Sequence, residues 1–160
     1  MDVLQLKEVP IAKVGMLIRK PSAEVFEAIV NPTITTQFWF TKSSGRLEAG
    51  KNVTWIWEMY NHSVVVNIRE IEQDKSILMD WGNYSSYTTV KWLLTPFGKD
   101  ATYLTVINSG FEGDGDKVMK DALDSQGGFT WVVAGLKCFL EHGICLNLIA
   151  DAFPKGLREH

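Results

Sequence analysis

Five segments that alternate apolar and polar side chains constrain the fold more than any other feature of this sequence. They are residues 53–60, 63–72, 76–82, 87–96 and 101–109. Alternation with a period of two is typical of a strand with one buried face. Because the connections between these segments are short, we expect neighbouring strands to pair antiparallel. One apolar face per strand indicates a sheet that is covered on one side.

The chain before this series predicts a strand followed by short helices. Residues 12–20 alternate enough for a first strand. Residues 21–32 carry helix signals, with Ser22 as the candidate N-cap, and residues 33–40 predict a second short helix. A strand, one or two short helices, a meander and a final long helix indicate an α+β fold.

The final helix is expected to begin near Asp114 or Asp116 and to end near His142. Gly127 and Gly128 lie within it and could kink or split it. From residue 129 onward one broad stripe is apolar and one is polar. A third stripe, formed by Trp131, Cys138 and His142 beside Gly135, needs a second packing partner, such as the first helices or the tail 144–154.

Gly135 has two interpretations. A glycine inside a helix costs about 1 kcal/mol relative to alanine. Close packing against another backbone would explain its presence, and so would a need for space beside a ligand.

The tryptophans are the most distinctive feature of the predicted buried face. Four of the six lie on the sheet face under the helix, and Trp39 lies near its mouth. Indoles on this face either fill a core or leave a cavity that binds an apolar small molecule. The residues predicted to line the cavity are Trp39, Trp55, Trp57, Met79, Trp81, Trp92, Phe129, Val133 and Leu136. The indole N–H groups of the tryptophans and the hydroxyls of Tyr60, Tyr84, Tyr87 and Tyr103 are the candidate polar contacts.

Composition excludes several classes of partner. The net charge of -3 and the absence of a basic run argue against nucleic acid and against an anionic membrane surface. We find no leader sequence and no apolar run of about 20 residues, so we expect no membrane span and a cytoplasmic protein. The two cysteines, Cys138 and Cys145, are expected as reduced thiols.

No recognisable catalytic constellation is present, so the question of enzymatic activity stays open. Cys138 and His142 are one helical turn apart, but no residue nearby orients the histidine. Cys138, His142 and Cys145 lack an evident fourth zinc ligand. We find no nucleotide-binding or hydrolase motif, and we expect no cofactor and no metal.

Several short motifs resemble the START-like (SRPBCC) superfamily, and within it the AHSA-type family related to activators of the heat-shock chaperone ATPase. The resemblance covers roughly residues 12–143 of a single domain, 1–160, with the tail packed on it. It implies a helix-grip fold, in which a curved antiparallel sheet wraps around the long C-terminal helix, with a cavity between them. The motifs are "IRKPSAEVFEAIVNP", "FWF", "GRLEAG", "VVVNIREIEQDKSILMDWG", "TTVKWLLTPFGKDATYLTVINSGF" and "GGFTWVVAGLKCFLEHG".

Three functional hypotheses follow. The first is binding of a small hydrophobic, lipid-like or aromatic ligand in the cavity. The second is a cyclase- or hydrolase-type enzyme that uses the same cavity and needs an acid or base inside it. The third is a chaperone cofactor that acts through its outer surface, and a homodimer is compatible with each of the three.

Overall fold

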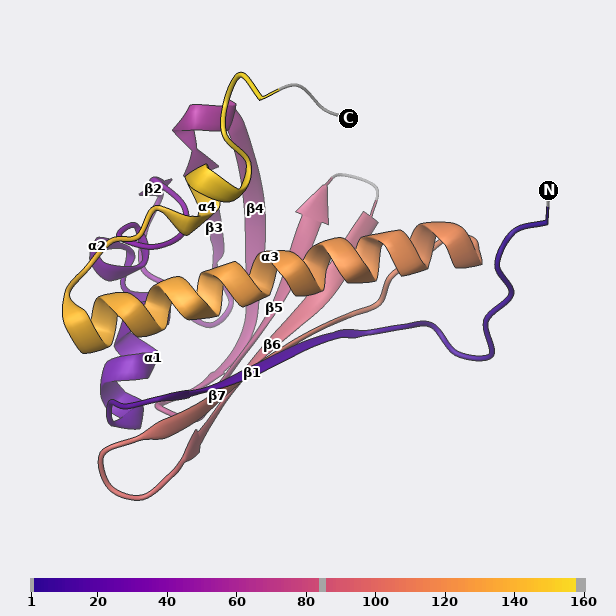
Figure 1. Ribbon diagram of the computed structural model, residues 1–160. Coiled ribbons are helices and arrows are strands. Elements are labelled where there is room, and N and C mark those ends of the chain that lie inside the picture. Colours follow the sequence, from indigo (N-terminus) through magenta and orange to yellow (C-terminus); the bar gives the residue numbers. More distant parts are fainter. Residues whose placement is uncertain (1, 84–85, 158–160) are drawn as a thin grey trace.

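An antiparallel seven-stranded sheet, in the order β1-β7-β6-β5-β4-β3-β2, forms the frame of the molecule (Figure 1). The computed structural model describes residues 2–83 and 86–157. The meander is confirmed, and β1 closes it by pairing with β7, so that Val14 lies opposite Val106. The strands are β1 (Ala12–Ile18), β2 (Lys42–Ser43), β3 (Asn52–Trp57), β4 (His62–Glu72), β5 (Ser76–Asn83), β6 (Ser86–Pro96) and β7 (Thr102–Ser109).

Two parts of the sheet differ from the sequence prediction. Residues 41–52, for which the sequence predicts no strand, contain β2, a short edge strand whose polar side chains give no alternation to detect. The strand predicted for residues 53–60 ends at Trp57, and the 3₁₀ turn η1 (Glu58–Tyr60) follows. Asn61 then adopts a left-handed conformation, with φ of 48°, and this residue begins the reversal into β4.

Two short helices, α1 (Ser22–Val30) and α2 (Pro32–Thr35), follow β1 as predicted. The prediction that Ser22 caps α1 is wrong, because Pro21 occupies the N-cap position. The Ser22 hydroxyl instead hydrogen-bonds the hydroxyl of Thr102 at 3.0 Å and ties α1 to β7. Helix α2 does have a capping side chain, since the Asn31 amide oxygen accepts from the Thr33 N–H at its start.

The long helix α3 (Gly115–His142) lies across one face of the sheet, and the helix-grip arrangement is confirmed (Figure 1). The Asp114 side chain accepts from the Lys117 N–H at its start, and Gly143, with φ of 67°, ends it. Gly127 and Gly128 neither split nor end the helix. Their propensity cost of about 1 kcal/mol each is offset by burial of the apolar stripe of α3 against the sheet.

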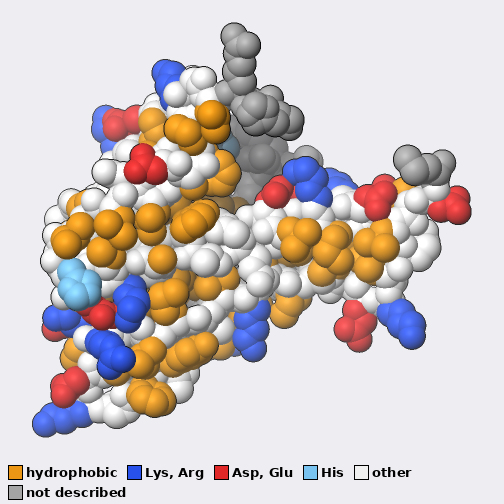
Figure 2. Space-filling model, in the orientation of Figure 1, with side chains coloured by type: hydrophobic (Ala, Val, Ile, Leu, Met, Phe, Trp, Pro, Cys, Tyr) orange, Lys and Arg blue, Asp and Glu red, His pale blue; other side chains and the backbone are white. Residues whose placement is uncertain are grey.

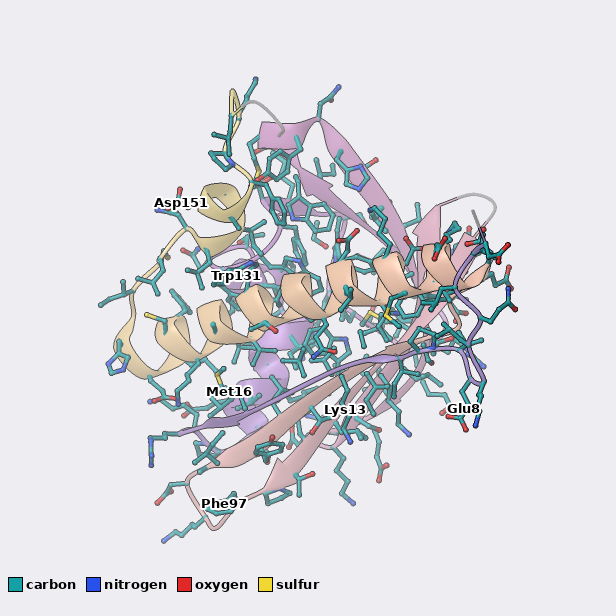
Figure 3. All side chains as sticks on the ribbon, turned by 45° about the vertical axis from the view of Figure 1, so that its right-hand side comes forward. Glu8, Lys13, Met16, Phe97, Trp131 and Asp151 are labelled. Atoms are coloured by element: carbon teal, nitrogen blue, oxygen red, sulfur yellow. The ribbon has the colours of Figure 1, made fainter. Side chains whose placement is uncertain are left out.

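Gly135 is explained by close packing. A Cβ there would lie 3.2 Å from the Cβ of Phe38 and 3.8 Å from the Leu148 side chain. The second partner of α3 is therefore the chain that follows α2, together with the short helix α4 (Leu148–Ala152). Trp131 on the same helix stays 42% exposed, and Figure 3 shows it on the side of α3 that faces α4.

An ion pair within the C-terminal half of α3 connects the helix to the end of β1 through hydrogen bonds. The Lys137 ammonium donates to the Leu17 carbonyl at 2.8 Å and to the Glu141 carboxylate at 2.6 Å. Glu141, whose side chain is only 10% exposed, also accepts from the Arg19 N–H at 3.0 Å. Burial raises the pKa of the Glu141 carboxyl, but these donors outweigh it, and the pKa lies below its ordinary value of 4.5.

An extended arm, residues 2–11, runs from β1 toward the N-terminal end of α3 (Figure 1). The Leu4 N–H donates to the Asp116 carboxylate at 3.0 Å. Gly115 permits this approach, since a Cβ there would lie 1.7 Å from the Leu4 carbonyl oxygen.

Figure 2 shows apolar side chains on the surface above both halves of α3. Figure 3 shows Glu8 of the arm far from Phe97 at the β6–β7 turn.

Candidate ligand pocket

A pocket of about 580 Å³ lies between the N-terminal half of α3, the ends of β5 to β7 and the C-terminal segment. Its lining changes character from one side to the other. One side is aromatic, a second is polar, and a third comes from η1 and α4. The lining residues are Trp39, Trp57, Tyr60, His62, Val64, Trp81, Gly82, Thr88, Asn108, Phe111, Lys117, Asp121, Asp124, Ser125, Gly128, Phe129, Val132, Ile149 and Phe153.

The aromatic side is a packed cluster of indoles. The rings of Trp39 and Trp81 are stacked, with centroids 5.7 Å apart and planes inclined by 19°. Trp57 meets both of them edge-on, at 6.4 and 6.3 Å. Phe129 of α3 lies 5.9 Å from Trp81 and joins the cluster to the helix. Because the rings touch one another, they offer a ligand an apolar aromatic wall rather than a cage.

The polar side is a hydrogen-bonded chain that crosses from the sheet to α3. Asn108 is 3% exposed, and its amide nitrogen donates to the Thr88 hydroxyl at 2.9 Å and to the Thr89 carbonyl at 3.0 Å. The Ser125 hydroxyl donates to the Asn108 amide oxygen at 2.7 Å. The side chains of Thr88, Asn108 and Ser125 all line the pocket, and we call them the polar wall.

Charged side chains follow one face of α3 along the pocket. Lys117, Asp121, Asp124 and Gly128 are spaced three or four residues apart, which places them on one helical face. The Lys117 ammonium pairs with Asp121 at 2.5 Å, and Asp124 pairs with Lys120 at 2.8 Å. The pocket therefore contains ionisable groups as well as rings.

The C-terminal segment forms the third side. The Tyr60 hydroxyl lies 3.1 Å from the Ile149 carbonyl oxygen and 2.8 Å from that of Phe153. This contact holds α4 over the pocket, where the side chains of Ile149 and Phe153 join the lining. Burial, and next the negative charge of Asp151, raise the pKa of the Tyr60 phenol above its ordinary value. Figure 3 shows Asp151 on α4.

The structure divides the residues predicted to line a cavity into two groups. Trp39, Trp57, Trp81 and Phe129 do line the pocket. The other five pack in the core outside the lining, because they lie farther along the strands and α3, where helix and sheet meet closely. These five are Trp55, Met79, Trp92, Val133 and Leu136, each at most 1% exposed.

The polar contacts differ from those predicted. Tyr60 lines the pocket, but its hydroxyl is engaged by the C-terminal segment. Tyr87 and Tyr103 are exposed and lie outside the lining, and Tyr84 lies outside the described residues. Asn108 was not predicted as a pocket residue. The alternation of β7 does indicate it, because Asn108 is a polar residue at the inward position that follows Leu104 and Val106.

The candidate thiol and zinc residues do not come together as a site. Cys138 is half-buried and Cys145 is exposed, and both are free thiols. The Cys145 thiol lies 3.5 Å from the Gln37 side-chain oxygen, and His142 is exposed. Across residues 2–83 and 86–157, no three His, Cys, Asp or Glu side chains are grouped so as to hold a metal ion.

Comparison with known proteins adds two findings on the sequence. The family described as "Activator of Hsp90 ATPase homolog 1-like protein" matches residues 19–141. No curated protein matches the chain. Among the helices of the described residues, none is both long enough and apolar enough to cross a membrane.

Solved structures share the fold at low sequence identity. Protein SSP2350 from Staphylococcus saprophyticus is 28% identical, with a TM-score of 0.74 over 86% of this chain and 96% of that one. The Aha1 dimer from Colwellia psychrerythraea is 12% identical, with a TM-score of 0.72 over 84% and 98%. The Hsp90 activator PFC0360w from Plasmodium falciparum is 13% identical, with a TM-score of 0.63 over 83% and 96%.

Proposed function

The chain belongs to the Activator of Hsp90 ATPase homolog 1-like family, and we propose that it binds a flat apolar small molecule in the pocket beside α3. The observation that carries this proposal is the aromatic wall. Trp39, Trp57, Trp81 and Phe129 reach the surface of a space of about 580 Å³, which lies within the usual size range of ligand pockets. Aromatic ligands stack on such a wall and gain both area burial and ring contacts.

Binding is expected to stabilise the fold by a measurable amount. A ligand present at 100 times its Kd adds about 2.7 kcal/mol to the free energy of unfolding. For a chain of this length that corresponds to a rise in Tm of roughly 5–10 °C. A panel of naphthalene-, indole- and fatty-acyl-type compounds, screened by thermal shift and followed by isothermal titration calorimetry, would measure it.

The neighbouring glycines of α3 supply a matched pair of variants. A Cβ at Gly127 or at Gly128 would meet nothing within 4 Å, so both accept a side chain. Only Gly128 lines the pocket, and Gly127 is exposed. We expect Gly128→Leu to fill part of the pocket and weaken binding at least tenfold, while Gly127→Leu leaves the Kd unchanged.

Two outcomes would contradict the proposal. One is the absence of any Tm rise across the panel at saturating concentrations. The other is binding that Gly128→Leu and Gly127→Leu affect equally, since that would locate the ligand elsewhere.

The family membership supports a second candidate, a chaperone cofactor that acts through the outer surface. On this hypothesis the chain binds an Hsp90-type chaperone and changes its ATPase rate. Filling the pocket with Gly128→Leu would then leave that rate unchanged. An ATPase assay with both leucine variants separates the two candidates, and sedimentation of the free chain tests for a homodimer.

The lining also keeps an enzymatic role open. Such a role requires an acid or base inside the pocket, and His62, Asp121 and Asp124 line it. The enzyme hypothesis predicts that a bound compound is converted to product. Incubating each ligand from the panel with the protein, followed by mass spectrometry, tests that prediction.

A further inference from the structure

The polar wall has a fixed hydrogen-bond direction. Asn108 places one end of its amide 3.0 Å from the Thr89 carbonyl oxygen, which can only accept. That end must be the NH₂ group, so the amide oxygen faces Ser125. A hydrogen bond of 2.7 Å to this oxygen requires the Ser125 hydroxyl to be the donor.

These bonds use the donors of the wall and leave acceptors. Both amide hydrogens of Asn108 are engaged, one by Thr88 and one by Thr89. The single hydroxyl hydrogen of Ser125 is engaged by Asn108, so only its lone pairs remain. The Thr88 oxygen accepts from Asn108, and its hydrogen points toward the Trp81 carbonyl, 3.4 Å away. A ligand that meets Ser125 must therefore bring the hydrogen itself.

The charges on α3 reinforce this preference. Asp121 and Asp124 line the pocket on the helical face that also carries Ser125, and an ionised carboxylate only accepts hydrogen bonds. Lys117 is the one Lys or Arg side chain among the described lining residues, and it is held by Asp121 at 2.5 Å. Asp124 is paired with Lys120, so an anionic ligand would face two carboxylates whose lysine partners are both already engaged.

We infer that the pocket selects flat ligands that carry a neutral hydrogen-bond donor, such as an aromatic hydroxyl, and discriminates against carboxylates. The ring packs on the indole of Trp81, which is less buried than Trp39 and Trp57, and the donor points to the Ser125 oxygen. This inference rests on the proposed function and adds the chemical class of the ligand to it.

Four naphthalenes that differ at one position test the inference. 2-Naphthol carries a donor, 2-methylnaphthalene matches its size without one, 2-methoxynaphthalene carries an acceptor only, and 2-naphthoate is anionic. One added hydrogen bond of about 0.5–1.5 kcal/mol corresponds to a Kd ratio of roughly 2 to 13. By titration calorimetry at pH 7 we expect 2-naphthol to bind tighter than 2-methylnaphthalene by that factor. We expect 2-methoxynaphthalene to gain nothing and 2-naphthoate to bind at least tenfold more weakly than 2-naphthol.

A variant of Asn108 tests the donor–acceptor direction of the hydrogen bonds in the polar wall. Asn108→Leu frees the Ser125 hydroxyl to donate, so the ratio between 2-naphthol and 2-methoxynaphthalene should approach one. Asn67→Leu makes the same change on the exposed side of β4 and should keep the wild-type ratio. The wild-type series stands without this variant, so the inference stays testable if Asn108→Leu does not fold.

The outcomes separate this inference from the proposed function. If 2-methylnaphthalene binds but 2-naphthol and 2-methoxynaphthalene bind equally well, the inference is wrong and the proposed function stands. If 2-naphthoate binds tightest, Lys117 recognises an anion and the inference is wrong. If none of the four binds, while the panel of the proposed function also gives no Tm rise, both fail.

Discussion

Replacing Tyr60 with phenylalanine should loosen the C-terminal segment without disturbing the sheet. The Tyr60 hydroxyl lies 2.8 Å from the Phe153 carbonyl oxygen and 3.1 Å from that of Ile149. It therefore links η1 to the backbone at the end of the chain. Tyr60→Phe keeps the ring that packs against the core and removes only this contact.

The free energy lost in Tyr60→Phe follows from the number of hydrogen atoms that the phenol can donate. One phenol hydrogen is shared between two carbonyl oxygens, so the loss is that of a single hydrogen bond, about 0.5–1.5 kcal/mol. If that energy opposes local opening of α4, the open population rises roughly 2- to 13-fold. The amides that report on it are those of Asp151, bonded to Asn147 at 2.9 Å, and of Phe153, bonded to Ile149 at 3.3 Å.

Hydrogen exchange followed by NMR is the direct assay. The Asp151 and Phe153 amides should exchange faster by that factor in Tyr60→Phe, while amides in β4 to β6 should keep their rates. Tyr103→Phe is the matched control, because Tyr103 lies on the outer face of the sheet over Gly15. Unchanged exchange of both reporter amides in Tyr60→Phe would refute the role assigned to the phenol.

The same contact predicts a dependence on alkaline pH. The pKa of Tyr60 is raised above its ordinary value of 10.0, so the neutral phenol stabilises the folded segment. That stabilisation is complete below the unfolded-state pKa near 10 and is lost as pH rises through the higher folded-state value. The tyrosinate absorbance of wild type minus that of Tyr60→Phe should therefore titrate above pH 10. A difference titration centred at or below 10 would contradict the burial argument.

Three further variants test other parts of the structure. Gly127→Ala should raise the free energy of unfolding in urea by about 0.5–1 kcal/mol, because the methyl group meets no neighbour and helix propensity improves. Gly115→Ala should displace the arm at Leu4, which would speed tryptic cleavage at Lys7 while the urea midpoint stays nearly constant. Glu141→Gln should cost about 1–2 kcal/mol at pH 7, and the difference from wild type should shrink as pH falls below 4.5, because the lowered pKa stabilises only the ionised form.

The sequence predicted the faces of the strands well because alternation is a local property. In β4 every second residue from Val64 to Ile68 is buried, as the pattern requires. The position of a residue along its strand relative to the helix is not a local property. Trp55 and Trp57 share one face of β3, yet only Trp57 lines the pocket, because it ends the strand beyond the close contact between sheet and helix.

The polar wall could not be predicted for a related reason. Thr88 and Asn108 come from neighbouring strands and Ser125 from α3, and only the packed fold brings them within 3 Å. Each of them alone resembles an ordinary surface residue. The inward register of Asn108 was the one local signal, and it became interpretable only after the register of β7 was known.

The location of the pocket follows from a change in residue type on both of its walls. Along the buried face of β6 the side chains shrink from Trp92 through Val90 to Thr88, and along β7 Val106 gives way to Asn108. Close packing requires apolar volume on both sides of the interface between sheet and helix. Both strands become small or polar at the same end of the sheet, so the space there remains open while the rest of the interface is filled.

The facing part of α3 changes in the same way, from Val132 and Phe129 to Gly128 and Ser125. A small residue on one wall alone would be filled by a larger one opposite. The 2.7 Å hydrogen bond between Ser125 of α3 and Asn108 of β7 fixes the separation of helix and sheet beside this space, so the volume of the pocket is set by the folded structure. A ligand that completes both the apolar and the polar contacts should therefore stabilise the fold more than an apolar ligand of equal size.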